Sequence, residues 1–441
     1  MERRRVVILG AAGRDFHNFN TLFREDEGSE VVAFTAAQIP DIEGRNYPAE
    51  VAGRLYPDGV PIRAEEELES ILRGQDVDEV VFSYSDVSHE YVMHLASRVT
   101  AWGADFRLCS APATMLESSK PVIAVTAVRT GVGKSQTTRF LSGVLKKLGK
   151  KVVAIRHPMP YGDLSRQICQ RFATYEDLDR HETTIEEREE YEPHIDAGFV
   201  VYAGVDYEKI LRQAETEADV ILWDGGNNDT SFYKPDLQFT LVDPHRPGDE
   251  LTYYPGETNL LLADVILVNK VQTAATENVE RVLANCRETN PRAQLLQCRS
   301  AITVSQPELI RGKRALVVED GPTLTHGGLS RGAGWYAATE AGASEIVDPT
   351  QFAVGSLRET YEKYPNARGI LPAMGYGDAQ IRDLEATINA VDADVVVEGT
   401  PIDLSRVLKS NLPVANVSYD LEEVEAGKIE TAVRQTLERL G

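Results

Sequence analysis

A glycine-rich turn followed by a lysine and a serine is the feature of this sequence best suited to chemistry. The turn spans residues 130–135, follows the apolar run 122–128 and opens a helical pattern. Backbone N–H groups in such a unit converge on phosphate oxygens, and the start of the helix adds a favourable dipole. Lys134 would reach the β- and γ-phosphates, and Ser135 would ligate Mg²⁺. The sequence therefore predicts a nucleoside triphosphate site formed by Thr130, Gly131, Val132, Gly133, Lys134, Ser135 and Gln136.

The phosphate-binding turn departs from the commonest pattern at its start. That pattern places a glycine five residues before the second glycine, where this chain has Val128. The turn instead resembles the deviant form of dethiobiotin synthetase and the MinD-type ATPases. MinD-like loops carry a signature lysine five residues before the main lysine, and Arg129 holds that position here. We expect Arg129 to contact a phosphate, either in its own subunit or across a dimer interface.

Two later strand ends carry polar residues suited to a metal ion and a base. One apolar run ends in Asp224, and a carboxylate at such a position holds Mg²⁺ directly or through water. An aspartate that caps a turn is the alternative. Another run ends in Asn269-Lys270-x-Gln272, which resembles the base-reading Asn-Lys-x-Asp of GTPases. Guanine presents two adjacent donors, and the Gln272 amide offers one carbonyl oxygen, so the sequence favours ATP, with Asn269 available to an adenine edge.

Cationic residues recur at the predicted strand ends, which face the binding crevice in open parallel sheets. Arg156 and His157 follow one strand, and His245 and Arg246 follow a later one. His326 lies in a glycine-rich loop after a further predicted strand. Considered one at a time, each of these residues is more consistent with a structural role than with substrate binding. Their recurrence at one sheet edge indicates an anionic substrate, because arginine pairs bidentately with phosphate or carboxylate oxygens.

Three α/β segments must position these residues, and we place them at 1–118, 119–312 and 313–441. Apolar runs alternate with helical patterns, such as 65–72 and 90–99, which predicts parallel sheets covered by helices on both faces. The expected fold is a multi-domain α/β chain, with a Rossmann-like N-terminal domain, a P-loop NTPase domain of the deviant Walker A type and a C-terminal α/β domain. The predicted strands are 5–9, 30–34, 79–83, 105–109, 122–128, 151–155, 220–223, 264–268, 315–318, 344–347, 369–371, 394–397 and 414–417.

Two stretches leave more than one interpretation open. The turn 10–13 resembles half of a dinucleotide-binding fingerprint, but Phe16 stands where a third glycine would be, which favours a plain turn. The stretch 176–192 is dense in Glu, Asp and Arg, which favours a solvated helical insertion or lid, or simply a surface helix.

The composition excludes several classes of partner. A net charge of −23 argues against nucleic acid or an anionic membrane as a main partner. No run approaches the roughly 18 consecutive apolar residues of a membrane span. The short basic start leads into a turn rather than a secretory signal, so we expect a cytoplasmic protein. Four cysteines match no zinc or redox spacing and are expected to be buried free thiols, namely Cys109, Cys169, Cys286 and Cys298.

The chain resembles the archaeal cyclic 2,3-diphosphoglycerate synthetase family over nearly its whole length, in the strings 119–139, 156–163, 224–228 and 318–328. The resemblance implies ATP-driven closure of 2,3-diphosphoglycerate into a cyclic pyrophosphate, with release of ADP and phosphate. It also implies Mg²⁺ and a homodimer. Lys134, Ser135 and Asp224 would then handle ATP and Mg²⁺. Lys134 is expected to be catalytic through ATP, and the residues expected to act on the anionic substrate are Arg129, Arg156, His157, His245, Arg246 and His326.

Two other functions remain open on the sequence. A regulatory P-loop NTPase or a metallochaperone shares the deviant loop, but such proteins usually carry a Cys/His metal site and the sequence shows none. A related ATP-dependent ligase or kinase would act on a different anionic metabolite.

Overall fold

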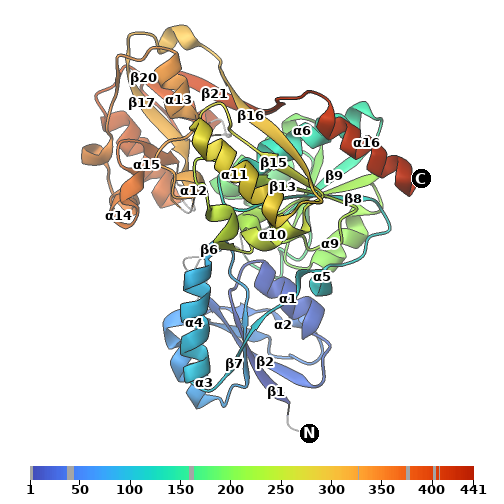
Figure 1. Ribbon diagram of the computed structural model, residues 1–441. Helices are drawn as coiled ribbons and strands as arrows, with labels where there is room; N and C mark the ends of the chain where they lie inside the picture. Colours follow the sequence, from blue (N-terminus) through green and yellow to red (C-terminus); the bar gives the residue numbers. More distant parts are fainter. Residues whose placement is uncertain are drawn as a thin grey trace.

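The structure is a computed structural model that describes residues 3–36, 44–157, 163–325, 327–373, 378–400, 404–406 and 408–441. It has three α/β parts, with the N-terminal part in blue and the C-terminal part in orange on either side of the central one (Figure 1). Among the helices of these ranges, none combines the length and the apolar character needed to cross a membrane.

The N-terminal domain forms, within the described residues, a six-stranded sheet that is parallel except at β3. Its central strand, β1 (Arg4–Leu9), has four consecutive buried apolar residues, as expected for a parallel strand covered on both faces. The strands in sheet order are β3 (Asn46–Tyr47), β4 (Val60–Ala64), β2 (Ser29–Ala36), β1, β5 (Glu79–Phe82) and β7 (Asp105–Leu108). The helices are α1 (Arg14–Leu22), α2 (Ala49–Ala52), α3 (Leu68–Gly74), α4 (His89–Ala101) and α5 (Ala111–Thr114).

The central domain is built on β8 (Val122–Ala127), in which every residue is buried. Parallel neighbours β12 (Val220–Asp224) and β13 (Leu237–Val242) flank this strand, so their carboxyl ends meet at the loop that follows β8. The remaining strands of this part are β10 (Gln170–Phe172), β11 (Val200–Ala203), β9 (Val152–Arg156), β15 (Val265–Val268) and β16 (Gln294–Val304). The helices are α6 (Lys134–Lys147), α7 (Tyr175–Arg180), α8 (Ile185–Asp196), α9 (Tyr207–Ala214), α10 (Gly256–Leu262) and α11 (Thr276–Thr289).

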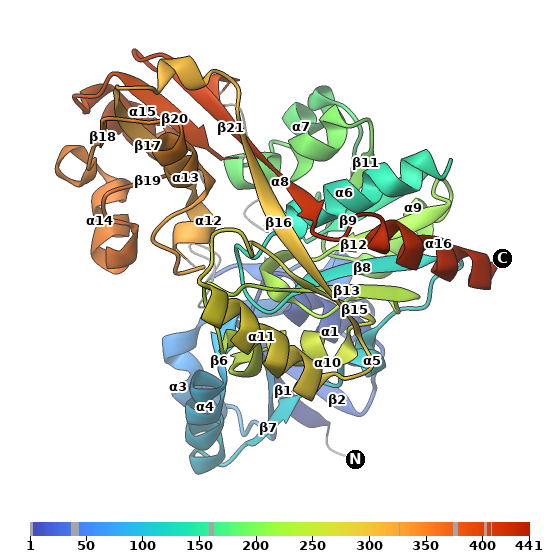
Figure 2. The same cartoon turned by 45° about the horizontal axis from the view of Figure 1, so that its top comes forward.

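A long antiparallel ribbon joins the central and C-terminal parts into one continuous sheet. β16 pairs with β15 through residues 294–297 and then with β21 (Val414–Glu423) through residues 298–304, and the two strands run side by side in Figure 2. After β21 the chain returns to the central domain as α16 (Lys428–Leu440), which packs against α6 through Ile429 and Val433. The boundaries at residues 118 and 312 stay predictions, and the topology adds this return of the C-terminus.

The C-terminal part surrounds β17 (Arg314–Asp320), which lies parallel to β20 (Val395–Gly399), β18 (Glu345–Ile346) and β19 (Leu371–Ala373). Its core is apolar and separate from the core of the central domain. The helices are α12 (Gly321–Leu324), α13 (Ala333–Glu340), α14 (Ser356–Lys363) and α15 (Asp378–Ala390).

A second, shorter ribbon ties the N-terminal domain to the central one. β6 (Val87–Ser88) pairs antiparallel with β14 (Tyr253–Tyr254), and the N–H of His89 donates to the Thr252 carbonyl at 2.9 Å. The turn 10–13 also meets the central domain, because a Cβ added at Gly13 would lie 1.5 Å from Nε2 of His157. This face of the turn is therefore covered by protein, which agrees with the plain-turn interpretation.

The predicted fold class is confirmed, and each predicted strand overlaps an observed one. The prediction for 176–192 is wrong in one respect: the stretch is helical, but α8 is not a solvated helix. Its Glu189, Tyr191 and His194 are all buried, because the helix is covered on opposite faces. Tyr191 packs on the core of the central domain, and Glu189 accepts from Thr400 of the C-terminal part. Charge density alone did not reveal that these polar groups have partners inside the protein. Cys286 and Cys298 are buried as predicted, Cys109 and Cys169 only partly, and all four are free thiols.

Candidate active site

The loop after β8 has the shape of a phosphate-binding turn and requires its glycines. Gly131 and Gly133 have φ values of 77° and 118°, which side chains rarely adopt. A Cβ at Gly133 would lie 2.3 Å from Nε2 of Gln136 and 2.4 Å from Nδ2 of Asn269. The turn is thus packed closely from behind, while α6 starts at its end with Lys134.

Lys134 is held over this turn by an asparagine from the loop after β12. Its Nζ donates to Oδ1 of Asn228 at 2.6 Å, and Nδ2 of Asn228 donates to the Thr130 hydroxyl at 3.2 Å. Burial lowers the pKa of Lys134, and the charges of Asp224 and Asp86 partly oppose this. Asn228 therefore orients the Lys134 side chain at the start of α6.

Asp224 ends β12 fully buried, next to two basic side chains. Its Oδ2 lies 2.5 Å from Nη1 of Arg156 and 3.5 Å from Nε2 of His194. Burial opposes ionisation, but the Arg156 guanidinium and His194 outweigh it and hold the pKa of Asp224 below its usual range. Arg156 is shared with α8, because its Nε donates to Glu190 at 3.0 Å. The pair Glu190 and His194 was missed by the sequence analysis, which had no local signal for contacts of this insertion.

A second buried aspartate, Asp243 at the end of β13, organises the opposite side of the loop. Burial is outweighed by Lys270, His245 and Arg246, which together lower the pKa of Asp243. These cations also reach the loop backbone. Nη2 of Arg246 donates to the Thr130 carbonyl at 2.8 Å, and Nζ of Lys270 donates to the Gly131 carbonyl at 2.5 Å. The strand-end position that identified Asp224 would have identified Asp243 as well. The ion-pair distances from Asp243 are 2.8 Å to His245, 3.3 Å to Arg246 and 3.2 Å to Lys270.

Asn269, which was predicted to bond an adenine edge, lies behind the loop together with Gln136 and Gln272. Nδ2 of Asn269 donates to the Val132 carbonyl at 2.8 Å, and Oε1 of Gln136 accepts from the Ser300 hydroxyl at 3.1 Å. Gln272 bonds the backbone of Ser300 through both ends of its amide. These contacts hold the loop in place, and base recognition by Asn269 stays a prediction.

Arg129 and His157 are both paired with carboxylates of the chain. Nε of Arg129 donates to Oδ1 of Asp86 at 2.6 Å, and its Nη1 pairs with Asp249. Nε2 of His157 lies 3.3 Å from Oδ2 of Asp229. Phosphate contact by either residue therefore stays a prediction.

The C-terminal part contacts the phosphate-binding turn through Thr323 and, by way of Arg246, through Gly327. A Cβ at Gly131 would meet the Thr323 hydroxyl at 3.3 Å, and Nη1 of Arg246 donates to the Gly327 carbonyl at 2.6 Å. α8 also reaches this part, because the Thr400 hydroxyl donates to Glu189 at 2.7 Å. His326 lies outside the described residues.

Several buried polar atoms near the ends of β12 and α8 have no hydrogen-bond partner among the residues that the structure describes. Such atoms are rare in folded proteins and often mark a place where water, an ion or a ligand binds. Two of these atoms, Trp223 Nε1 and Tyr207 Oη, lie toward the N-terminal domain. Their rings form an aromatic cluster with Phe232, in which ring centroids lie 4.4 to 5.8 Å apart. The atoms without a partner are Trp223 Nε1, Tyr207 Oη, Asp229 Oδ1, Asp224 Oδ1, His194 Nδ1 and Tyr191 Oη.

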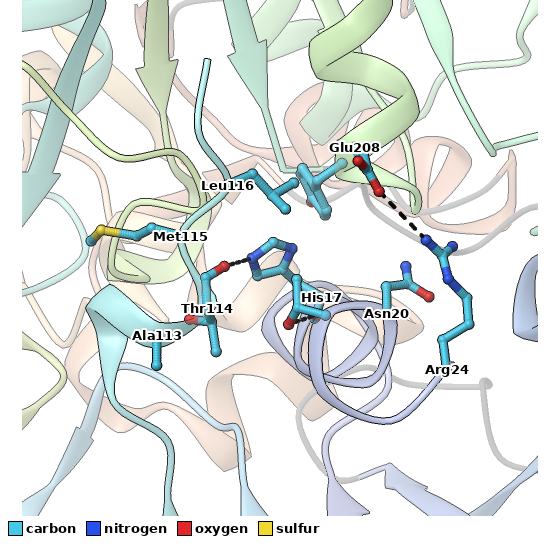
Figure 3. Close-up of a pocket in the computed structure, with 10 residues that line it drawn as sticks. His17, Asn20, Arg24, Ala113, Thr114, Met115, Leu116 and Glu208 are labelled. Carbon is cyan, nitrogen blue, oxygen red and sulfur yellow. Dashed lines mark hydrogen bonds and ion pairs between the residues drawn. The ribbon is translucent and has the colours of Figure 1, made fainter. Parts of the chain in front are cut away.

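A cavity of about 240 Å³ lies between α1, α9 and residues 113–116, away from the phosphate-binding turn (Figure 3). Two of its charged or basic side chains are paired within the described residues, while Tyr207 Oη in the lining has no hydrogen-bond partner there. Nε2 of His17 lies 2.6 Å from the Thr114 carbonyl, and Arg24 pairs with Asp206 at 3.0 Å and with Glu208 at 3.9 Å. The lining of this cavity includes no residue of the phosphate-binding turn, so the candidate active site is placed at the turn.

Comparison with known proteins gives one relative of high identity. No family model matches the chain. The chain is 62% identical over 434 residues to arginine synthetase ArcE of Thermococcus kodakarensis. This match covers 98% of this chain and 97% of that protein. It is 22% identical over 265 residues to a cyclic 2,3-diphosphoglycerate synthetase of Thermococcus sibiricus, covering 56% of this chain and 59% of that protein. A crystal structure of LpxK from Aquifex aeolicus in complex with ATP is similar with a TM-score of 0.44 and 13% identity, over 84% of this chain and 99% of that one.

Proposed function

Because the chain belongs to the family of arginine synthetase ArcE, we propose that it forms arginine in a reaction driven by ATP. It is an enzyme of the ATP-dependent ligase class, as its relatives are named synthetases. The predicted resemblance is thus confirmed at the level of the family. Which product the enzyme makes is a separate question, and the charges of the site help to answer it.

The observation that carries the proposal is that the described arginines of the site are already paired with carboxylates, whereas Lys134 bonds the neutral Asn228. Arg156 faces Asp224 and Glu190, and Arg246 faces Asp243. A highly charged anion such as 2,3-diphosphoglycerate would have to displace these carboxylates. A zwitterionic amino acid with a neutral side chain fits a charge-balanced site better.

The chemistry of arginine formation calls for ATP. L-Citrulline, the ureido counterpart of arginine, carries a poorly leaving oxygen on the carbon that must accept an amine. Transfer of the γ-phosphoryl group to this oxygen releases ADP. Ammonia then attacks the carbon, and the C–O bond breaks as phosphate leaves. One ATP, one citrulline and one ammonia give one arginine, one ADP and one phosphate.

The residues of the phosphate-binding turn take defined roles in this reaction. Lys134 and the backbone N–H groups of the turn would neutralise the β- and γ-phosphates. Mg²⁺ fits the oxygen ligands that remain, because Asp224 Oδ1 has no hydrogen-bond partner within the described part of the chain and the Ser135 hydroxyl follows Lys134. When bound, the ion would supply positive charge for the transferred group.

The buried polar atoms near the N-terminal domain that lack a hydrogen-bond partner among the described residues suit a ureido group. Trp223 Nε1 and Tyr207 Oη are donors, and Asp229 Oδ1, which lies 3.9 Å from Nε of Arg14, is an acceptor. A ureido group offers one carbonyl acceptor and several N–H donors, so it can satisfy both kinds. A guanidinium group offers donors only.

Cyclic 2,3-diphosphoglycerate synthesis is the second candidate, favoured by the partial match to such a synthetase and by the recurrence of cations at the sheet edge. Incubation with MgATP and one candidate substrate at a time would distinguish arginine synthesis from cyclic 2,3-diphosphoglycerate synthesis. We expect ADP release to rise with citrulline plus ammonium, and amino-acid analysis to reveal arginine. Stimulation by 2,3-diphosphoglycerate instead, with a cyclic pyrophosphate in the ³¹P NMR spectrum, would contradict the proposal.

A further inference from the structure

We propose that Asp86 of the N-terminal domain is a positioning residue for the phosphate-binding turn. Its carboxylate reaches the first residues of the turn twice. Oδ1 accepts from Nε of Arg129 at 2.6 Å, and Oδ2 accepts from the backbone N–H of Thr130 at 3.2 Å. A residue outside the P-loop domain thus fixes both a side chain and a backbone amide of the loop.

The Arg129 side chain is enclosed by two carboxylates and an aromatic ring. Besides Asp86, its guanidinium pairs with Asp249 and lies over the Tyr253 ring, 3.7 Å from the centroid. Stacking and paired carboxylates together hold a guanidinium firmly in one orientation. Only 7% of Arg129 is exposed, so the residue anchors the loop rather than presenting a free charge.

Asp86 is itself held rigidly. It has a φ of 57°, a left-handed conformation that is strained for a residue with a side chain. The next two residues form β6, whose partner strand β14 contains Tyr253. The ribbon between the domains therefore brings the carboxylate and the stacking ring to Arg129 together, and the backbone strain at Asp86 is maintained by its surroundings.

The charge of Asp86 also reaches the main lysine. Burial lowers the pKa of Lys134, and Asp86 is one of the two carboxylates that act most strongly to raise it again. The N-terminal domain thereby contributes to the charge state of the ATP site as well as to its shape. This role concerns ATP alone and holds for either candidate product.

Calorimetric titration of the full chain with MgATP tests this role. Asp86→Ala should weaken ATP binding by about tenfold or more, equivalent to about 1.4 kcal/mol, because the first residues of the turn lose their anchor. Asp86→Glu should recover part of the affinity, since it keeps the charge. The control is Asp105→Asn, which removes an exposed carboxylate of the same domain that pairs with Arg4 and should leave the affinity unchanged.

Tyr253→Leu provides a second test that keeps both carboxylates. It should weaken MgATP binding in the same direction but less, because only the stacking contact is lost. Folded Asp86→Ala protein with wild-type affinity for MgATP would overturn the proposal, as would equal losses for Asp86→Ala and Asp86→Glu. Wild-type protein that binds no ATP would instead contradict the assignment of the loop.

Discussion

At the scale of the residue, the site is defined by buried charges that are paired inside the chain. Asp224 ends β12 and Asp243 directly follows β13, the two strands that flank β8, and each is surrounded by basic groups. Removing one partner of such a buried pair leaves the other uncompensated, which is costly. Single substitutions here are therefore expected to affect both activity and stability, and the tests below include controls for the second effect.

Lys134→Ala should reduce ATP turnover by at least about 100-fold, because the turn would lose its positive charge toward the transferred phosphoryl group. The fold should remain, since Lys134 makes a side-chain hydrogen bond only to Asn228 among the described residues. Steady-state ADP release and a thermal melt measure the two effects. Lys147→Ala, at an exposed position of the same helix, is the matched control and should keep full activity. Substantial turnover by folded Lys134→Ala protein would refute the assignment.

Glu319 at the end of β17 gives a prediction about pH and stability. Burial raises its pKa to about 8, against opposing hydrogen bonds from the backbone N–H groups of Trp335, Gly334 and Gly332. The folded-state pKa lies above the unfolded pKa of about 4.5, so protonation of this group stabilises the folded protein. The stabilisation is complete below pH 4.5 and is lost as pH rises through about 8. Glu319→Gln cannot ionise, so its stability relative to wild type should rise by about 1 kcal/mol or more between pH 6 and pH 8. Chemical denaturation at several pH values measures this, and a pH-independent difference would contradict it.

At the scale of the element, local pattern predicted the strands and the phosphate-binding turn but not what α8 contacts. The run 122–128 is apolar except for Thr126 and the helix after the turn is amphipathic, so strand, turn and helix could all be located from the sequence. The pairing of Glu190 with Arg156, and of Asp86 with Arg129, depends on which elements lie side by side. Nothing in the spacing of residues within one element carries that information.

The turn and its helix offer a matched pair of glycine substitutions. Gly133→Ala should abolish ATP binding, because its φ of 118° is unsuitable for alanine and the new Cβ would clash with Gln136 and Asn269. Gly143→Ala lies in the interior of α6, where a Cβ meets nothing within 4 Å, and should stabilise the protein by about 0.5–1 kcal/mol. ATP titration and denaturant unfolding measure both. Normal ATP binding by Gly133→Ala would show that the turn tolerates the change and does not wrap phosphate closely.

At the scale of the whole molecule, three parts meet at one loop. The N-terminal domain reaches it through Asp86, the central domain supplies it, and the C-terminal part covers it through Thr323 and Gly327. The ribbon of β16 and β21 connects the covering part to the central sheet. A homodimer remains a prediction from the resemblance.

Arg246→Ala tests whether the C-terminal part is tied to the loop through this side chain. Arg246 bonds the carbonyls of Thr130 and Gly327, and hydrogen bonds from a charged donor contribute about 1.5–3 kcal/mol each. Hydrogen exchange in residues 321–329 should become faster, and the KM for ATP should rise about tenfold. The control is Arg434→Ala on α16, an exposed residue that pairs with Glu430. Unchanged exchange in this segment would show that other contacts hold the C-terminal part in place.

The central claim is that the energy of ATP bound at this turn is used to make arginine. The most direct measurement supplies the purified protein with MgATP, L-citrulline and ¹⁵N-ammonium and follows arginine by mass spectrometry together with ADP. The account predicts arginine that carries one ¹⁵N atom, formed in equal amount to ADP and absent from the Lys134→Ala reaction. ADP without labelled arginine, at any concentration of citrulline and ammonium, would contradict it.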